Sequence, residues 1–134
     1  MITLQKAKLA VEASEKKATE LGIAVTTTIV DEHGTVIAVS RMDGAFTVSP
    51  DFSFSKAFTS AALGFNSADL EPYAAEGKPY FGINTLMHGK LTTIAGGLPI
   101  VIDGKREGAV GVGGSTNTQE DVACAQEAVN VLIG

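Results

Sequence analysis

The six residues from Ser40 to Ala45, Ser-Arg-Met-Asp-Gly-Ala, place a guanidinium and a carboxylate two positions apart. They lie where an expected strand runs out into a glycine-containing loop. Arg41 carries a planar fork of donors that suits a carboxylate ligand, and Asp43 could orient it. One interpretation is therefore a polar ligand-binding site at a strand end. The alternative is a structural ion pair between Arg41 and Asp43 that fixes the loop over residues 43–49.

Lys56 is a second cation that could serve the same pocket. It shares one face of an expected helix with Ser49, Ser53 and Ser60, because these residues recur at three- and four-residue spacing. Two alternatives are open for this face. It is either solvated, or it forms a pocket wall in which Lys56 supplies a positive charge.

Two glycine-rich runs complete the candidate site. The first, over residues 96–100, contains Gly97 and Pro99, and the second, over residues 111–115, contains Gly113 and Gly114. Because the second run precedes an expected helix, its backbone N–H groups and the helix dipole could cradle an anion or carboxylate. Close packing of the backbone is the alternative explanation for both runs.

The side chains that could bind a metal or haem iron are scattered. His33 lies in a tight turn and is expected to be exposed, whereas His88 is either a metal or haem ligand or a surface loop residue. Cys124 lies on an apolar helix and is expected to be a small buried residue. No histidine, cysteine and carboxylate spacing matches a zinc site, so no metal site is predicted.

Hydrophobic periodicity and turn residues predict the elements that position these groups. The expected helices are one from the N-cap Thr3 to Gly22, one from the N-cap Ser49 to Leu63, a short one over 67–75 and one over 118–133 with Thr118 and Asp121 as a capping box. The expected strands are 23–30, 35–42, 90–95, 98–102 and 105–112, and residues 76–90 form a loop.

The resulting order, α-β-β-α-α-β-β-β-α, predicts an α+β fold. Short hairpin connections imply a five-stranded antiparallel sheet flanked by helices, within one domain over residues 1–134. The helix over 118–133 is apolar on more than one side. It is therefore expected to pack against the sheet and a second subunit, which predicts a homo-oligomer.

Composition limits the partners. The chain of 134 residues has a formal net charge of −5, and its 10 basic residues form no cluster that could follow a phosphate backbone. Nucleic acid is therefore not an expected partner. No apolar run is long enough to span a bilayer, so a membrane is not an expected partner either. A single cysteine and a polar N-terminal pattern favour a cytoplasmic protein.

Five short motifs occur in an order that resembles the GlcG/HbpS family of small proteins, which also occurs as the C-terminal domain of PduO-type proteins. They are Val30 to Gly34, Ser40 to Ala45, Ser55 to Ala61, Gly96 to Ile100, and Gly108 to Gly114 followed by Gln119 to Asp121. The resemblance covers nearly the whole chain. It implies a profilin-like fold, a homo-oligomer, and haem or another tetrapyrrole, such as a corrinoid, as the ligand.

These observations favour a small oligomeric protein that binds haem or a related tetrapyrrole or anionic small molecule. The expected ligand-binding residues are Arg41, Asp43, Lys56, Gly97, Pro99, Gly113 and Gly114. The alternative is a small catabolic enzyme for a carboxylate or carbonyl metabolite. Arg41 would then anchor the substrate, and Asp43 or Lys56 would move a proton. A third interpretation is a structural subunit without a ligand.

Overall fold

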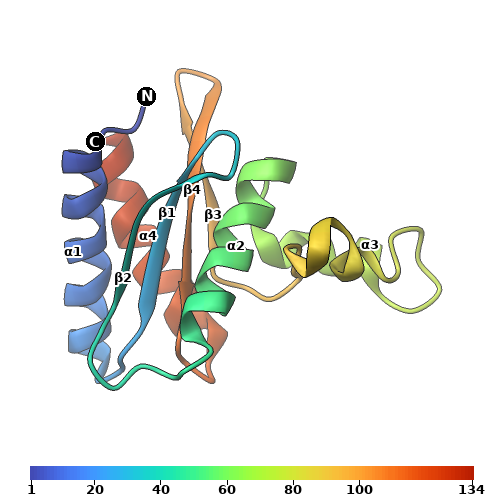
Figure 1. Ribbon diagram of the computed structural model, residues 1–134, viewed down its shortest axis with the longest axis horizontal. Coiled ribbons are helices and arrows are strands. Elements are labelled where there is room, and N and C mark those ends of the chain that lie inside the picture. Colours follow the sequence, from blue (N-terminus) through green and yellow to red (C-terminus); the bar gives the residue numbers. More distant parts are fainter.

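The computed structural model describes residues 1–134 and contains an antiparallel sheet of four strands in the order β2-β1-β4-β3 (Figure 1). The strands are β1 (Thr26–Asp31), β2 (Val36–Arg41), β3 (Gly97–Ile102) and β4 (Lys105–Gly113). Two hairpins, β1–β2 and β3–β4, meet along the central strands, where Thr26 lies opposite Gly113 and Asp31 opposite Gly108.

Helices cover both faces of this sheet. The chain-terminal helices α1 (Leu4–Leu21) and α4 (Thr118–Ile133) pack side by side on one face, and α2 (Ser49–Leu63) packs on the other (Figure 1). Between α2 and β3 the chain forms the 3-10 turn η1 (Ser67–Leu70), the short helix α3 (Glu71–Ala74), and the 3-10 turns η2 (Ile83–Thr85) and η3 (Met87–Gly89). The α+β class with a helix-flanked antiparallel sheet is thus confirmed. No helix combines the length and apolar character needed to cross a membrane.

The main core lies between the sheet and the α1–α4 pair. Alternate residues of β4 point to opposite faces, so Val110 and Val112 join this core while Ala109 faces α2. Buried alanines, including Ala10 of α1 and Ala128 of α4, allow the two helices to approach closely. Because α1 and the sheet cover α4 within one chain, the apolar character of α4 needs no second subunit to explain it.

The opposite interface, between α2 and the sheet, is polar and close. The hydroxyl of Ser53 donates to the Gly111 carbonyl at 2.8 Å and lies 2.7 Å from Thr28 Oγ1, and Ser49 Oγ lies 2.8 Å from Thr26 Oγ1. The expectation of a solvated face is wrong, because all four residues of that face are buried against the sheet. The threonines of β1 supply hydroxyl partners that make this burial favourable.

Helix ends agree with the sequence to within one residue. The side chain of Thr3 accepts a hydrogen bond from the Lys6 amide at 3.1 Å, and Gly22 ends α1 in the left-handed conformation, as predicted. Two predicted N-caps are wrong by one residue, because Val48 rather than Ser49 precedes α2 and Asn117 rather than Thr118 caps α4. Asp121 makes contacts outside α4. The predicted capping box is therefore wrong.

One of the five predicted strands, the one over residues 90–95, does not form. Side chains of neighbouring elements take its backbone groups instead: the Thr92 amide donates to Thr59 Oγ1 at 2.9 Å, and Ser67 Oγ donates to the Ile94 carbonyl at 2.6 Å. These bonds hold the segment against α2 and η1, so its amides and carbonyls cannot continue the sheet.

Residues 71–90, which we call the arm, project away from the sheet beside α2 (Figure 1). Its apolar side chains are unusually exposed: Tyr73 is 54%, Tyr80 53%, Phe81 67%, Leu86 56% and Met87 53% accessible. A concentration of exposed large apolar residues marks a surface for interaction. The arm therefore carries a concentration of exposed apolar side chains, whereas on α4 only Ile133, at its end, is an exposed large apolar residue.

We predict opposite effects for two serines of α2. Ser53→Ala should lower the free energy of unfolding by about 1–3 kcal/mol, because Thr28 and the Gly111 carbonyl lose a buried partner. Ser60→Ala should leave stability unchanged or raise it, because Ser60 Oγ is buried and has no hydrogen-bond partner within the protein. Urea unfolding of both variants measures this, and equal losses would contradict the prediction.

Candidate functional site

Arg41 and Asp43 lie at the end of β2 and are both exposed. No ion pair joins them; the guanidinium of Arg41 instead donates to the carbonyl of Ala45. The contact closes the loop that leads to α2, and the Ala45 amide also bonds to the Met42 carbonyl at 3.1 Å. This geometry favours a structural role for Arg41, whose hydrogen-bond partner is the backbone of the following loop and not Asp43.

Lys56 is buried, with 1% of its surface accessible, and its charge is paired. Its ammonium donates to Asp121 Oδ2 at 3.0 Å and to the Val112 carbonyl at 2.8 Å. The other Asp121 oxygen accepts from the Ser115 amide at 3.1 Å. Burial lowers the pKa of Lys56 and raises the pKa of Asp121, and the opposite charge of each partner counteracts these shifts. The pair thus ties α2 to the start of α4.

The glycines of the predicted site make room for this arrangement. A Cβ on Gly97 would lie 2.2 Å from the Lys56 carbonyl oxygen, and one on Gly96 would lie 2.9 Å from the Lys56 ammonium. A Cβ on Gly113 would lie 2.7 Å from Phe52 Cβ. Three of the predicted positions, Lys56, Gly97 and Gly113, therefore meet where α2 packs on the sheet. This favours close backbone packing as the explanation for both runs.

The last two predicted site residues lie apart from this interface. Pro99 pairs with Ala109 within the β3–β4 hairpin and is half-buried. Gly114 follows β4 with φ +147°, and a Cβ at this position would lie 2.6 Å from the Ala24 carbonyl oxygen. The seven predicted residues do not line one common cavity: Gly114 faces a shallow depression with Gly44 and Phe46, on a different part of the surface from the cavities below.

Asp121 is the residue that sequence reasoning missed. The pattern did hold a signal, because Asp121 falls on the same helical stripe as the buried residues Cys124, Ala125 and Ala128. A carboxylate on a buried stripe requires a partner, and Lys56 is the one buried cation. The sequence did not indicate that Lys56 is buried, because its neighbours on that face of α2 are serines, which are usually exposed.

The histidines and the cysteine fall in different surroundings. His33 is exposed in the β1–β2 turn, as predicted, and its amide donates to Asp31 Oδ1 at 2.8 Å. Cys124 is fully buried, as predicted, and burial raises the pKa of its thiol to about 11, so it is neither accessible nor ionised at neutral pH. No three histidine, cysteine or carboxylate side chains gather as a metal-binding group.

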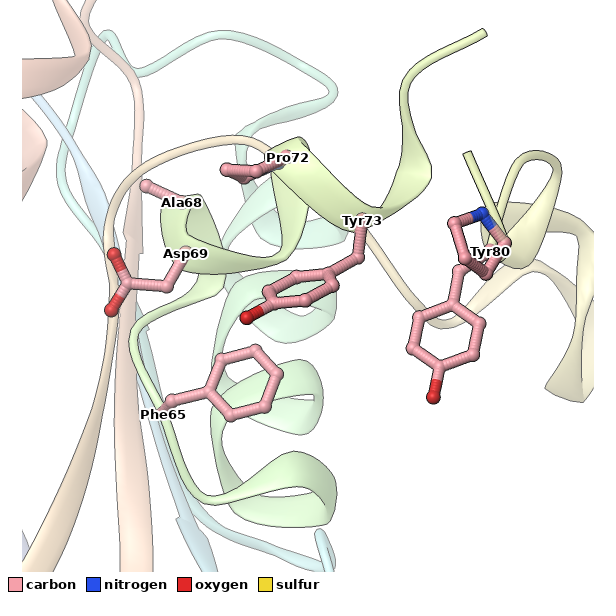
Figure 2. Close-up of a pocket in the computed structure, with 7 residues that line it drawn as sticks. Phe65, Ala68, Asp69, Pro72, Tyr73 and Tyr80 are labelled. Carbon is pink, nitrogen blue, oxygen red and sulfur yellow. The ribbon is translucent and has the colours of Figure 1, made fainter. Parts of the chain in front are cut away.

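Two cavities open beside the arm. The first, which we call the aromatic pocket, has a volume of about 690 Å³ (Figure 2). Figure 2 shows the rings of Phe65 and Tyr73 close together, with Tyr80 on one side and the Asp69 carboxylate on the other. The lining residues are Phe65, Ala68, Asp69, Pro72, Tyr73, Pro79 and Tyr80.

The second, which we call the helix–arm cavity, has a volume of about 430 Å³ and lies between α2 and residues 84–94. Its apolar walls come from Val48 and Phe52 on one side and from Leu91 and Ile94 on the other. The remaining lining residues are Asp51, Ser55, Asn84, Gly89 and Thr92. His88 and Lys90 flank Gly89, which places an imidazole and an ammonium group in the segment that borders this cavity.

Comparison with known proteins identifies the family. Residues 2–130 match the family model described as "Haem degrading protein HbpS-like". The chain belongs to the HbpS-like family. The resemblance to GlcG and HbpS that the motifs indicated is thereby confirmed, and the family match extends over almost the whole chain.

Relatives of this HbpS-like chain include two bacterial proteins and a solved haem complex. A 15.0 kDa protein from the dhaT-dhaS intergenic region of Citrobacter freundii is 35% identical over 89% of this chain and 84% of its own. Protein GlcG of Escherichia coli K12 is 32% identical over 84% of this chain and 81% of its own. The crystal structure of a PduOC:heme complex superposes with a TM-score of 0.92 at 28% identity, covering 97% of this chain and 94% of that one.

We predict strong coupling between Lys56 and Asp121. Lys56→Met or Asp121→Asn alone should lower the free energy of unfolding by about 3–5 kcal/mol, because each leaves a buried charge without its partner. The double variant leaves neither charge, so its loss should be smaller than the sum of the two. Chemical denaturation of the four proteins measures this coupling.

Lys17→Met is the matched control, because Lys17 pairs with Glu20 at 4.0 Å on the surface of α1. It should change stability by less than about 1 kcal/mol. Additive losses in the Lys56 and Asp121 variants would show that the pair does not act as a unit.

Proposed function

We propose that this protein binds haem or a related tetrapyrrole as an oligomer and that it acts as a binding protein. The observation that carries the proposal is its likeness, over nearly the full length of both chains, to a relative whose structure is a haem complex. Membership in a family named for haem chemistry supports the same ligand class. The helix–arm cavity is the site we assign to this ligand.

The walls of the helix–arm cavity suit a flat apolar macrocycle. Phe52 is 39% and Val48 50% accessible, so both present apolar surface from the α2 side. Leu91 and Ile94 face them from the segment that failed to form a strand. Binding of a macrocycle between these walls would remove apolar surface of both partners from water.

The chemistry of the border also suits a tetrapyrrole. An imidazole is a common axial ligand of haem iron, and an ammonium group can pair with a propionate. His88 lies in a left-handed turn in which Met87 has φ 53°, His88 59° and Gly89 77°, and Lys90 directly follows this turn. Non-glycine residues rarely adopt this conformation. We assign the ligand contact to His88 because such strained backbone often accompanies a functional side chain.

The residues first expected to touch the ligand have a supporting role in this proposal. Arg41 holds the loop that ends at Val48, a wall residue of the helix–arm cavity. Gly97 and Gly113 allow α2 to approach the sheet, which sets the position of Phe52. Lys56 would reach a ligand only by leaving Asp121 unpaired in the interior, so we do not assign it a contact.

Haemin titration monitored by the Soret band tests the proposed site. Phe52→Asp should weaken haem binding at least about tenfold, because it removes an apolar wall and adds a second carboxylate next to Asp51, which opposes the propionates. His88→Ala should change the Soret maximum, because it removes the imidazole that would hold the haem iron. Parallel titration with hydroxocobalamin compares a corrinoid with haem.

His33→Ala is the control for these variants, because His33 is the other histidine of the chain and lies in the exposed β1–β2 turn. Its haem spectrum and affinity should equal those of the wild type. Haem affinity and spectrum unchanged in both Phe52→Asp and His88→Ala would place the ligand elsewhere. Absence of saturable binding of either tetrapyrrole would reject the function itself.

Three exposed apolar residues of the arm support the oligomer part of the proposal. Phe81, Leu86 and Met87 are each more than half accessible and lie within seven residues of one another. Surface of this kind is enriched at contacts between protein chains. We assign the contact between copies to these three residues.

Sedimentation velocity at micromolar concentration tests the assembly. The wild type should sediment as an oligomer, and Phe81→Glu should shift it toward the monomer, because a charge would be buried at the contact. Leu9→Glu is the matched control, since Leu9 is 50% accessible on α1, away from the arm. A wild-type monomer, or equal shifts in both variants, would contradict the assignment.

A further inference from the structure

The geometry points to a second, separate site: the aromatic pocket binds a small organic cation with an apolar body, such as an alkylammonium compound. Asp69 is the one charged residue among the seven that line it, and neither a lysine, an arginine nor a histidine is among them. An anion would find no cationic partner there. The helix–arm cavity also has one carboxylate, that of Asp51, and the aromatic pocket differs from it in having three aromatic rings in its lining.

The rings that would contact the cation are held close together. The centroids of Tyr73 and Tyr80 lie 6.3 Å apart with an angle of 39° between the ring planes. The backbone amide of Tyr80 donates to the Tyr73 carbonyl at 2.8 Å, which fixes the spacing between the two segments. Phe65 supplies a third ring beside Tyr73 (Figure 2).

The backbone around these rings has restricted freedom. Phe65 follows Gly64, which ends α2 in the left-handed conformation with φ 80°. Pro72, the second residue of α3, directly precedes Tyr73, and Pro79 directly precedes Tyr80, so prolines fix φ next to both tyrosines. A pocket whose rings are already positioned loses little conformational entropy when a ligand binds.

The exposed ring faces identify the ligand class. Tyr73 is 54% and Tyr80 53% accessible, so their faces are free to receive a ligand. The face of an aromatic ring carries partial negative charge and attracts an ammonium group. The Asp69 carboxylate lies at one side of the Phe65–Tyr73 pair, and its negative charge also attracts a cation (Figure 2). The volume of about 690 Å³ is that of a site for a small metabolite.

The chain contains a built-in reporter for this site. It has two tyrosines and no tryptophan, and both tyrosines line the aromatic pocket. Intrinsic tyrosine fluorescence therefore reports on this pocket alone. The probes are choline and its neutral isostere 3,3-dimethyl-1-butanol, which have nearly the same shape and differ in charge. Choline should change the fluorescence saturably, with a dissociation constant about tenfold or more below that of the isostere.

Variants separate charge from shape. Tyr73→Leu should abolish or strongly weaken choline binding, followed through Tyr80, whereas Tyr73→Phe should retain it. Tyr80→Leu, followed through Tyr73, provides an independent test if Tyr73→Leu does not fold by circular dichroism. Asp69→Asn should weaken choline binding several-fold. Glu76→Gln makes the same charge change on the exposed arm outside the lining and should leave affinity unchanged.

Three results would overturn the inference. They are equal affinity for choline and its isostere, no saturable fluorescence change with choline, and undiminished choline binding in both leucine variants. Haem binding by the Tyr73→Leu variant should equal that of the wild type, because Tyr73 does not line the helix–arm cavity. Failure of the cation site would therefore be distinguishable from failure of the haem site.

Discussion

The buried ion pair between Lys56 and Asp121 is the constraint on which the rest of the structure depends. It joins α2, on one face of the sheet, to α4, on the other. The lysine side chain reaches α4 past the start of β3, where Gly96 and Gly97 leave space for it. A charge in this interior is tolerable only with its partner, so the helices, the glycines and the turn at Ser115 must all be in place together.

The two faces of the sheet bury their helices by different means. On the α1–α4 face, aliphatic side chains form the main core, and stability comes from burial of apolar surface. On the α2 face, serine and threonine hydroxyls pair across a short gap that glycines permit. Because α2 turns its polar side inward, apolar residues such as Phe52 remain accessible outside. The inverted polarity of this helix thus creates a wall of the helix–arm cavity.

The arm and the segment after it convert this exposed surface into two cavities of different character. Residues 84–94 face α2 across apolar walls and the carboxylate of Asp51, with His88 and Lys90 in the bordering segment, whereas residues 65–80 surround a space with three aromatic rings and the carboxylate of Asp69. The first cavity is the one that we propose for a tetrapyrrole, and the second is the one that we propose for a cation. Both cavities depend on polar side chains that hold the connecting segment: Thr59 bonds to Thr92, and Ser67 bonds to Ile94. The same contacts prevent the formation of a fifth strand.

The sequence by itself determined the local structure and the family. Thr3 and Gly22 mark the ends of α1, and the ordered motifs indicate the HbpS-like family, because caps and short motifs depend on residues that are near neighbours in the sequence. Contacts between distant residues were decided by the tertiary structure alone. Lys56 and Asp121 are 65 positions apart, and only the packing of α2 and α4 around the sheet brings them within 3.0 Å. Residues 90–95 are a similar case. Their sequence pattern predicts a strand, but their backbone groups bond to side chains that are remote in the sequence, so no strand forms.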